Sequence, residues 1–290
     1  MRLTRRSCTA ALVAWLCAPA PCAEDRGADV ADIPSKEIEL AVRAKDAPEA
    51  KDAAKRTYFL IEPRANARKP AKGYALLVVL PGGDGSRAFH PFVKRIFKHV
   101  LGPDFAAAQP VAAPLAITAQ IVWPTARTPG LYGAPATEDF VEAVIADAAA
   151  RLPIDRTRVY VMAWSSSGPA AYAISLRKEK AATGFFISMS WFRPAGLPPL
   201  EGAKGEAYVI EHSPGDKVCP FAMAKDAEQR LTAAGAKVKF VQTSGDHGWS
   251  GDVYGRMRAG IAWLEKNRSV PAAGEEKKGG GEGKKKAAEK

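Results

Sequence analysis

The chain alternates short apolar runs with longer amphipathic stretches, a pattern that predicts parallel strands connected by helices. Six apolar runs predict core strands at residues 74–80, 119–123, 159–162, 184–190, 207–211 and 238–242. Five stretches predict helices at residues 92–99, 137–152, 169–179, 221–234 and 253–266. Upstream, residues 36–44 and 57–62 predict an antiparallel pair of strands. The predicted fold class is therefore α/β, with a mostly parallel central sheet and helices on both faces.

A cluster of small residues directly follows the strand predicted at 159–162. It reads Trp164-Ser165-Ser166-Ser167-Gly168 and continues into a predicted helix, so it indicates a strand, a tight turn and a helix. Such a turn lifts a serine hydroxyl above the carboxyl edge of a parallel sheet, where it can act as a nucleophile. A serine that only caps the helix would give a similar local pattern.

Two serines of this cluster compete for the nucleophile position. The residues two before and two after the nucleophile pack against neighbouring backbone, so both are small and usually glycine. Around Ser165 these residues are Ala163 and Ser167, whereas Ser166 is preceded at that distance by Trp164. Because an indole does not fit where glycine is normally required, Ser165 is the predicted nucleophile.

Two later loops supply an acid and a base at the same predicted sheet edge. Asp216 lies in the loop after the strand at 207–211, and His247 lies in a glycine-bracketed loop after the strand at 238–242. Asp246 is an alternative acid, but adjacent turn residues tend to point their side chains apart, which favours Asp216. The chain order serine, aspartate, histidine is that of an α/β-hydrolase triad.

A triad of this kind needs an oxyanion site, because acyl transfer develops negative charge on the substrate oxygen. The apolar strand at 74–80 breaks into Pro81-Gly-Gly83-Asp-Gly85, which can bring a free N–H close to a substrate carbonyl. Gly83 and Ser166 are the predicted N–H donors. An ordinary strand-to-helix turn would also explain the loop; a phosphate cradle would need a Gly-Lys-Ser/Thr ending, which is missing here.

These stretches resemble the α/β-hydrolase esterases, a group with phospholipase/carboxylesterase-type, polyhydroxybutyrate-depolymerase and feruloyl-esterase-like members. The resemblance covers residues 74–264 and rests on three stretches: residues 80–85, residues 154–165, and residues 212–221 together with 245–249. It implies that these stretches hold the oxyanion loop, the nucleophile elbow, and the acid and base. Pro81 stands where many members have histidine, and Ala163 and Ser167 replace the elbow glycines. No insertion between elements is long enough to form a large lid domain.

Large aromatic residues fall at the predicted strand ends. Trp164, Trp191 and Trp249 are predicted to line the substrate site, although packing would place such residues there too. The histidines form no H-E-x-x-H or Cys/His ligand set, so neither a metal nor another cofactor is expected.

The chain ends differ in composition from the middle. Residues 1–23 have a basic start, a short apolar segment and small residues, which predicts a signal peptide too short for a stable membrane span. Residues 24–35 are then a linker, residues 36–268 the α/β-hydrolase domain, and residues 269–290 a disordered tail rich in Lys, Glu and Gly. The expected location is secreted or periplasmic. The leader holds three of the four cysteines, which leaves Cys219 in the mature chain.

The formal net charge of +11 includes three leader arginines and an excess of two lysines in the tail, so about +6 remains on the domain. No nucleic-acid-binding motif accompanies this charge, and nucleic acid is not an expected partner. The predicted function is a secreted serine hydrolase that cleaves small-molecule or polymer-linked carboxylic esters. The alternatives are a serine peptidase of the same fold and a catalytically silent binding module.

Overall fold

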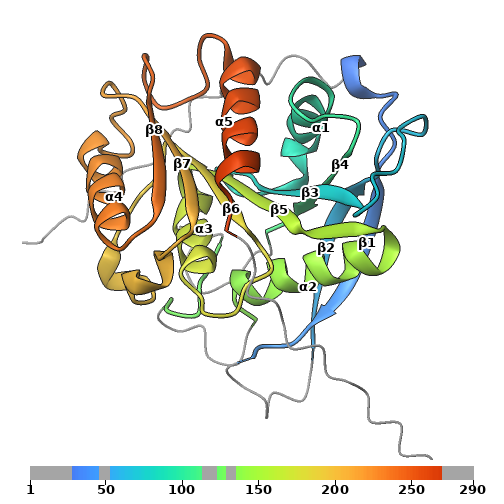
Figure 1. The fold of residues 1–290 in the computed structure, drawn as a ribbon, viewed down its shortest axis with the longest axis horizontal. Helices are drawn as coiled ribbons and strands as arrows, with labels where there is room; N and C mark the ends of the chain where they lie inside the picture. Colours follow the sequence, from blue (N-terminus) through green and yellow to red (C-terminus); the bar gives the residue numbers. More distant parts are fainter. Residues whose placement is uncertain (1–27, 46–52, 113–122, 129–134, 270–290) are drawn as a thin grey trace, which may run out of the picture.

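The computed structural model describes residues 28–45, 53–112, 123–128 and 135–269 (Figure 1). Within these ranges one eight-stranded sheet has the order β1-β2-β4-β3-β5-β6-β7-β8. Its strands are β1 (Lys36–Val42), β2 (Ala54–Ile61), β3 (Tyr74–Leu80), β4 (Phe105–Pro110), β5 (Ile154–Trp164), β6 (Gly184–Ser188), β7 (Ala207–His212) and β8 (Lys237–Gln242). The β1–β2 and β2–β4 pairs are antiparallel, and β3 to β8 are parallel.

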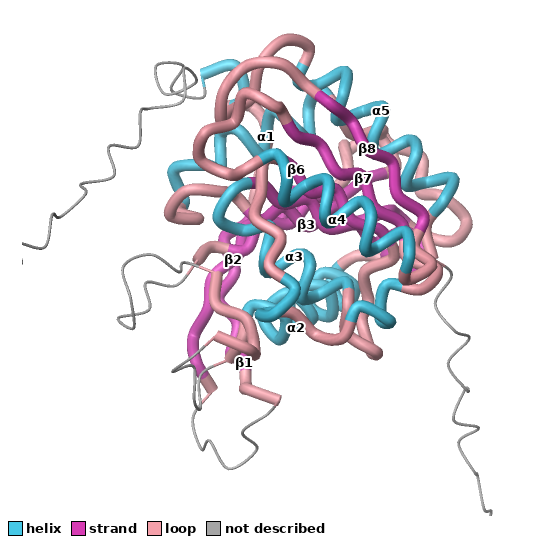
Figure 2. The backbone as a smooth tube through the Cα atoms, turned by 90° about the vertical axis from the view of Figure 1, so that its left-hand side faces the viewer, coloured by secondary structure: helices cyan, strands magenta, loops and turns pink. Residues whose placement is uncertain are grey.

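Helices cover both faces of the sheet, which gives the three layers seen in Figures 1 and 2. One face carries α1 (His90–His99) and α5 (Val253–Asn267), and the other carries α2 (Thr137–Arg151), α3 (Gly168–Ser175) and α4 (Phe221–Ala233). Successive strand residues point to opposite faces, so a strand between two helix layers is apolar throughout. In β3, Leu76 and Leu80 join the core under α2 and α3, and Leu77 and Val79 join the core under α1 and α5.

The predicted α/β class and the sheet with helices on both faces are confirmed. The strand predicted at 74–80 coincides with β3, and all five predicted helices are present with shifted ends. The largest shift is in α3, which ends at Ser175 although the pattern continues to residue 179. The upstream antiparallel pair is also present, as β1 and β2.

One central strand was not predicted. β4 reads Phe-Ala-Ala-Ala-Gln-Pro, and alanine has a low strand propensity, so the pattern gives little signal. Its residues are nevertheless buried between β2 and β3, where small side chains fit beneath helices on both faces. Of the strand predicted at 119–123, residues 119–122 lie outside the described part of the chain, and Trp123 is in a bend.

Parallel pairing brings four loops to one edge of the sheet. The loops after β3, β5, β7 and β8 all leave from carboxyl ends, which is the edge where α/β sheets bind ligands. Across the described ranges, every helix is too short or too polar to cross a membrane. The leader (1–23), residues 24–27 of the predicted linker, and all of the tail except Ser269 lie outside those ranges. Residues 113–122 and 129–134, which lie between β4 and α2, are also outside the described ranges. The absence of a large lid domain therefore stays a prediction.

Candidate active site

The turn after β5 has the geometry of a nucleophile elbow. β5 ends at Trp164, Ser165 has a φ of +56°, and α3 begins at Gly168 after a single short 3-10 turn. A non-glycine residue in this left-handed region costs about 1–3 kcal/mol, so the surrounding contacts must hold it in place. The Ser190 hydroxyl is one such contact, because it donates a hydrogen bond to the Ser165 carbonyl at 2.7 Å.

Three side chains from three loops form one hydrogen-bonded chain at this edge. The Ser165 hydroxyl oxygen lies 2.9 Å from Nε2 of His247, and Nδ1 of His247 lies 2.8 Å from Oδ2 of Asp216. Asp216 follows β7 and His247 follows β8, so the parallel order of β5, β6, β7 and β8 brings them beside the elbow. In this arrangement the imidazole can accept the serine proton while the carboxylate fixes its tautomer. Asp246 is exposed and does not take part in this chain.

The Asp216 carboxylate is buried and is surrounded by donors. Oδ1 accepts hydrogen bonds from the N–H groups of Val218 and Cys219, both at 2.8 Å. Oδ2 faces His247, and it also lies 3.3 Å from Nε2 of a second histidine, His212. These contacts fix the carboxylate in line with the His247 ring.

His212 is almost fully buried, with 1% of its surface exposed. Its Nε2 lies 2.8 Å from the Cys219 carbonyl oxygen, which can only accept, so Nε2 carries the proton. Its Nδ1 is buried and has no hydrogen-bond partner among the described residues. Burial lowers the pKa of His212, an effect that the nearby Cys219 carbonyl and Asp216 carboxylate offset only in part. His212 is therefore a neutral, structural neighbour of the acid at neutral pH, and its contact with Asp216 was not anticipated from the sequence.

The glycine loop after β3 lies against the elbow. Gly83 adopts a φ of +61°, a conformation that suits glycine, and its carbonyl accepts a hydrogen bond from the Ser166 hydroxyl at 2.8 Å. The N–H groups of Gly83 and Ser166 make no hydrogen bond to another described residue, so both can donate to a substrate oxygen. The carbonyl of Pro81, the residue that departs from the family pattern, accepts from the Trp123 indole at 2.9 Å.

Local contacts explain why the elbow lacks its usual glycines. The Ser167 hydroxyl oxygen lies 2.6 Å from the Leu80 carbonyl and accepts a hydrogen bond from Trp164 N–H at 3.0 Å, so it joins β3 to the elbow. One residue later, the backbone of Gly168 lies so close to Ser190 that a Cβ added at Gly168 would lie 1.8 Å from the Ser190 hydroxyl oxygen. Glycine is therefore required at Gly168, and a serine fits at Ser167.

The three tryptophans predicted to line the site occupy different environments. Trp164 is only 5% exposed and packs edge-on against Phe89, Phe92 and Trp249, so it supports the glycine loop and offers little surface to a substrate. Trp249 is half-buried in the same aromatic cluster. Trp191 is half-buried under the Arg193 guanidinium, whose carbon lies 4.3 Å from the ring centroid. Substrate contact by Trp191 and Trp249 stays a prediction.

Asp216, Cys219 and His247 are the only described group of three possible metal ligands, with donor atoms within 4.8 Å of one another. Burial, with a smaller effect of the nearby Asp216 charge, raises the pKa of the Cys219 thiol to about 12. The thiol is therefore protonated at neutral pH, whereas a metal binds the thiolate. Asp216 and His247 therefore fit the hydrogen-bonded chain with Ser165 better than a metal site that includes Cys219.

Solved structures with the same arrangement of elements include several hydrolases. An esterase structure from Rhizomucor miehei superposes with a TM-score of 0.60 and 12% identity, covering 81% of this chain and 84% of that one. A carboxylesterase from Lactobacillus plantarum superposes with a TM-score of 0.57 and 11% sequence identity, covering 80% of this chain and 97% of that one. An acylaminoacyl peptidase from Pyrococcus horikoshii superposes with a TM-score of 0.56 and 13% sequence identity, covering 81% of this chain but 42% of the peptidase. No protein-family model matches the sequence, and no curated protein does. The structural matches confirm the predicted α/β-hydrolase fold.

Proposed function

We propose that this α/β-hydrolase-fold protein is a serine hydrolase that cleaves carboxylic esters. The observation that carries the proposal is the hydrogen-bonded chain from Ser165 through His247 to Asp216. A strained serine, an imidazole within reach of its hydroxyl and a buried carboxylate behind that imidazole are the parts that acyl transfer needs.

In the proposed reaction the Ser165 oxygen attacks the ester carbonyl while Nε2 of His247 takes the hydroxyl proton. Asp216 stabilises the imidazolium cation, and the N–H groups of Gly83 and Ser166 bind the oxyanion. When the tetrahedral intermediate collapses, the C–O bond to the alcohol breaks and His247 returns the proton to the leaving oxygen. Water then attacks the acyl-enzyme by the same route, releasing the acid and restoring the Ser165 hydroxyl.

Esters are favoured over peptides by the extent of the matched structures. The chain covers 84% and 97% of the two esterases but only 42% of the peptidase, so it corresponds to one part of that protein. A silent binding module is disfavoured because binding alone requires neither a positive φ at Ser165 nor an imidazole within hydrogen-bond distance of its hydroxyl.

A fluorophosphonate probe tests this proposal, because it phosphonylates an activated serine. We expect the protein to be labelled, with the label on the tryptic peptide that contains Ser165, and to hydrolyse 4-nitrophenyl esters faster than peptide anilides. Absence of labelling and of ester hydrolysis, under conditions in which a known esterase is active, would support the binding-module alternative. Faster cleavage of the anilides would support the peptidase.

We also propose that the protein acts outside the cytoplasm, on the basis of the basic start and apolar segment of residues 1–23. The mature protein should then begin near Ala23 and contain Cys219 as its only thiol. N-terminal sequencing and thiol titration of protein from the native host test this, and an intact Met1 would contradict it.

A further inference from the structure

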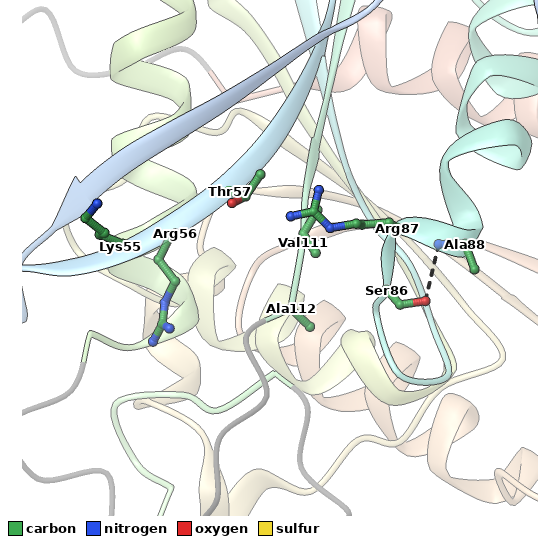
Figure 3. A pocket seen from close by; sticks show the side chains of 8 residues that line it. All are labelled: Lys55, Arg56, Thr57, Ser86, Arg87, Ala88, Val111 and Ala112. Atoms are coloured by element: carbon green, nitrogen blue, oxygen red, sulfur yellow. Dashed lines mark hydrogen bonds between the residues drawn. The ribbon is translucent and has the colours of Figure 1, made fainter.

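A cavity of about 380 Å³ opens beside the glycine loop (Figure 3). Its walls are residues 55–57 of β2, residues 86–88 after β3, and residues 111–112 after β4. Three of these residues, Lys55, Arg56 and Arg87, carry a positive charge. The cavity is not part of the triad, and nothing in the proposed ester chemistry explains its charge.

The cavity shares a loop with the proposed oxyanion site. Ser86 is three residues after Gly83, and an extended segment of that length spans at most about 10 Å. The loop is turned rather than extended, because Gly85 N–H donates to the Gly82 carbonyl at 3.0 Å. Ala112, which lines the cavity, donates a hydrogen bond from its N–H to the Gly85 carbonyl of this loop, also at 3.0 Å. The cavity wall and the proposed oxyanion site are thus connected through one hydrogen-bonded loop.

Two of the three cations that line the cavity are paired with carboxylates. Lys55 forms an ion pair with Glu39 at 2.9 Å, and Arg87 forms one with Glu37. Arg56 is half-buried and forms no ion pair or hydrogen bond with any residue that the structure describes. Asp84 adds a third carboxylate beside the cavity, because its Oδ1 accepts a hydrogen bond from Ser86 N–H at 3.0 Å. Arg56 therefore differs from Lys55 and Arg87 in lacking an ion pair, and not because positive charge is in excess.

Arg56 has the properties of an anion-binding residue. Burial lowers the pKa of its guanidinium, but arginine remains charged at neutral pH, so the charge persists without a partner. A guanidinium presents two parallel N–H donors, which match the two oxygens of a carboxylate. In Figure 3 Arg56 and Lys55 leave β2 in opposite directions, so the ion pair of Lys55 does not neutralise Arg56.

We propose that this cavity binds a carboxylate of the substrate through Arg56, so that the preferred ester carries a free carboxylate in addition to the ester group. The inference rests on the proposed esterase function and adds a substrate class to it. The ester carbonyl would lie at Ser165 and Gly83, with the carboxylate in the cavity on the far side of the same loop. A linear monoester of a dicarboxylic acid has a suitable shape.

The test compares two 4-nitrophenyl esters of adipic acid, one with its second carboxyl free and one with it methylated. We expect kcat/KM to be higher for the free acid, and Arg56→Gln to lower the ratio of the two values by about 10-fold or more, the loss typical of a hydrogen-bonded charge. Arg56→Lys, which keeps the charge but not the paired donors, should give an intermediate ratio. Arg156→Gln removes the same charge from an exposed site near the start of β5 and should leave the ratio unchanged.

A binding measurement separates failure of this inference from failure of the proposed function. Monomethyl adipate should bind to the Ser165→Ala protein, as measured by calorimetry, and binding should weaken by a similar factor when Arg56→Gln is added. An unchanged ratio of kcat/KM in Arg56→Gln, or equal binding with and without Arg56, would overturn the inference while leaving the esterase proposal intact. If both esters are inert but binding still depends on Arg56, the esterase proposal fails and the carboxylate site stands.

Discussion

Nε2 of His212 lies 3.3 Å from Oδ2 of Asp216, so the acid of the proposed triad contacts two imidazoles. Only His247 also reaches Ser165. His212 is buried, and its unpartnered Nδ1 leaves no acceptor to stabilise a second proton. The site thus contains one histidine that can change charge during a reaction and one that is held neutral.

The burial of neutral His212 predicts that the folded protein loses stability in acid. The pKa of His212 is below 6.5 in the folded state and returns toward 6.5 on unfolding, so the unfolded chain binds more protons as the pH falls below 6.5. Stability is therefore retained above that pH and lost as the pH falls toward the folded-state pKa. His212→Gln keeps a side-chain donor and removes the titration. We expect it to lower the slope of unfolding free energy against pH by at most about 1.4 kcal/mol per pH unit.

Urea unfolding of both proteins between pH 5 and pH 8 measures this slope. Burial also lowers the pKa of His90, so part of the acid loss should persist in His212→Gln. Parallel pH profiles for the two proteins would show that His212 does not titrate as proposed.

The roles of the two central serines predict different labelling. Ser165→Ala should abolish reaction with the fluorophosphonate probe, because the nucleophile is gone. Ser166→Ala keeps its backbone N–H and loses only the hydrogen bond to the Gly83 carbonyl, so labelling should slow by less than about 10-fold. Rates of labelling followed by in-gel fluorescence measure both. The reverse ranking would move the nucleophile to Ser166.

The choice of acid predicts unequal effects of two neighbouring substitutions. Asp216→Asn leaves the nucleophile in place but removes the charge behind His247, and by analogy with protease triads turnover should fall about 10⁴-fold. Asp246→Asn removes an exposed carboxylate outside the hydrogen-bonded chain and should change turnover only a few-fold. Steady-state kinetics on one 4-nitrophenyl ester compare them, with circular dichroism to check folding. A larger loss in Asp246→Asn would reassign the acid.

The buried hydroxyl of Ser167 predicts that its removal lowers the stability of the fold. Its hydroxyl is fully buried between the Leu80 carbonyl and Trp164 N–H, so Ser167→Ala leaves both backbone groups without this partner. We expect a loss of about 1–3 kcal/mol in the free energy of unfolding, measured by urea titration. Thr232→Ala, which removes a hydroxyl from the exposed face of α4, is the matched control and should change stability by less than about 0.5 kcal/mol. Equal losses in the two variants would remove the structural argument for a serine at this elbow position.

The sequence by itself determined the fold class and the candidate triad. Branched apolar runs identify β3, β5, β7 and β8, and the carboxyl ends of parallel strands share one edge. Polar residues in the loops after those runs therefore converge. Together with the small neighbours of Ser165 and the chain order of an α/β-hydrolase triad, this is why Ser165, Asp216 and His247 could be selected from the sequence. The same reasoning does not apply to β4, whose alanines give no strand signal and become a strand only between β2 and β3.

Tertiary structure alone decided which side chains lack partners and which are covered. Trp164 follows a strand like any candidate wall residue, but packing by Phe89 and Phe92 buries it. His212 meets Asp216 because the acid loop folds back over the end of β7. Arg56 is paired in register with Leu40, so Glu37 and Glu39 lie on the other face of the two strands, where they bind Arg87 and Lys55. Hydrophobic periodicity records which way a residue faces along its own strand or helix. It carries no information about the distance to a residue on another element, and that distance sets both burial and charge pairing.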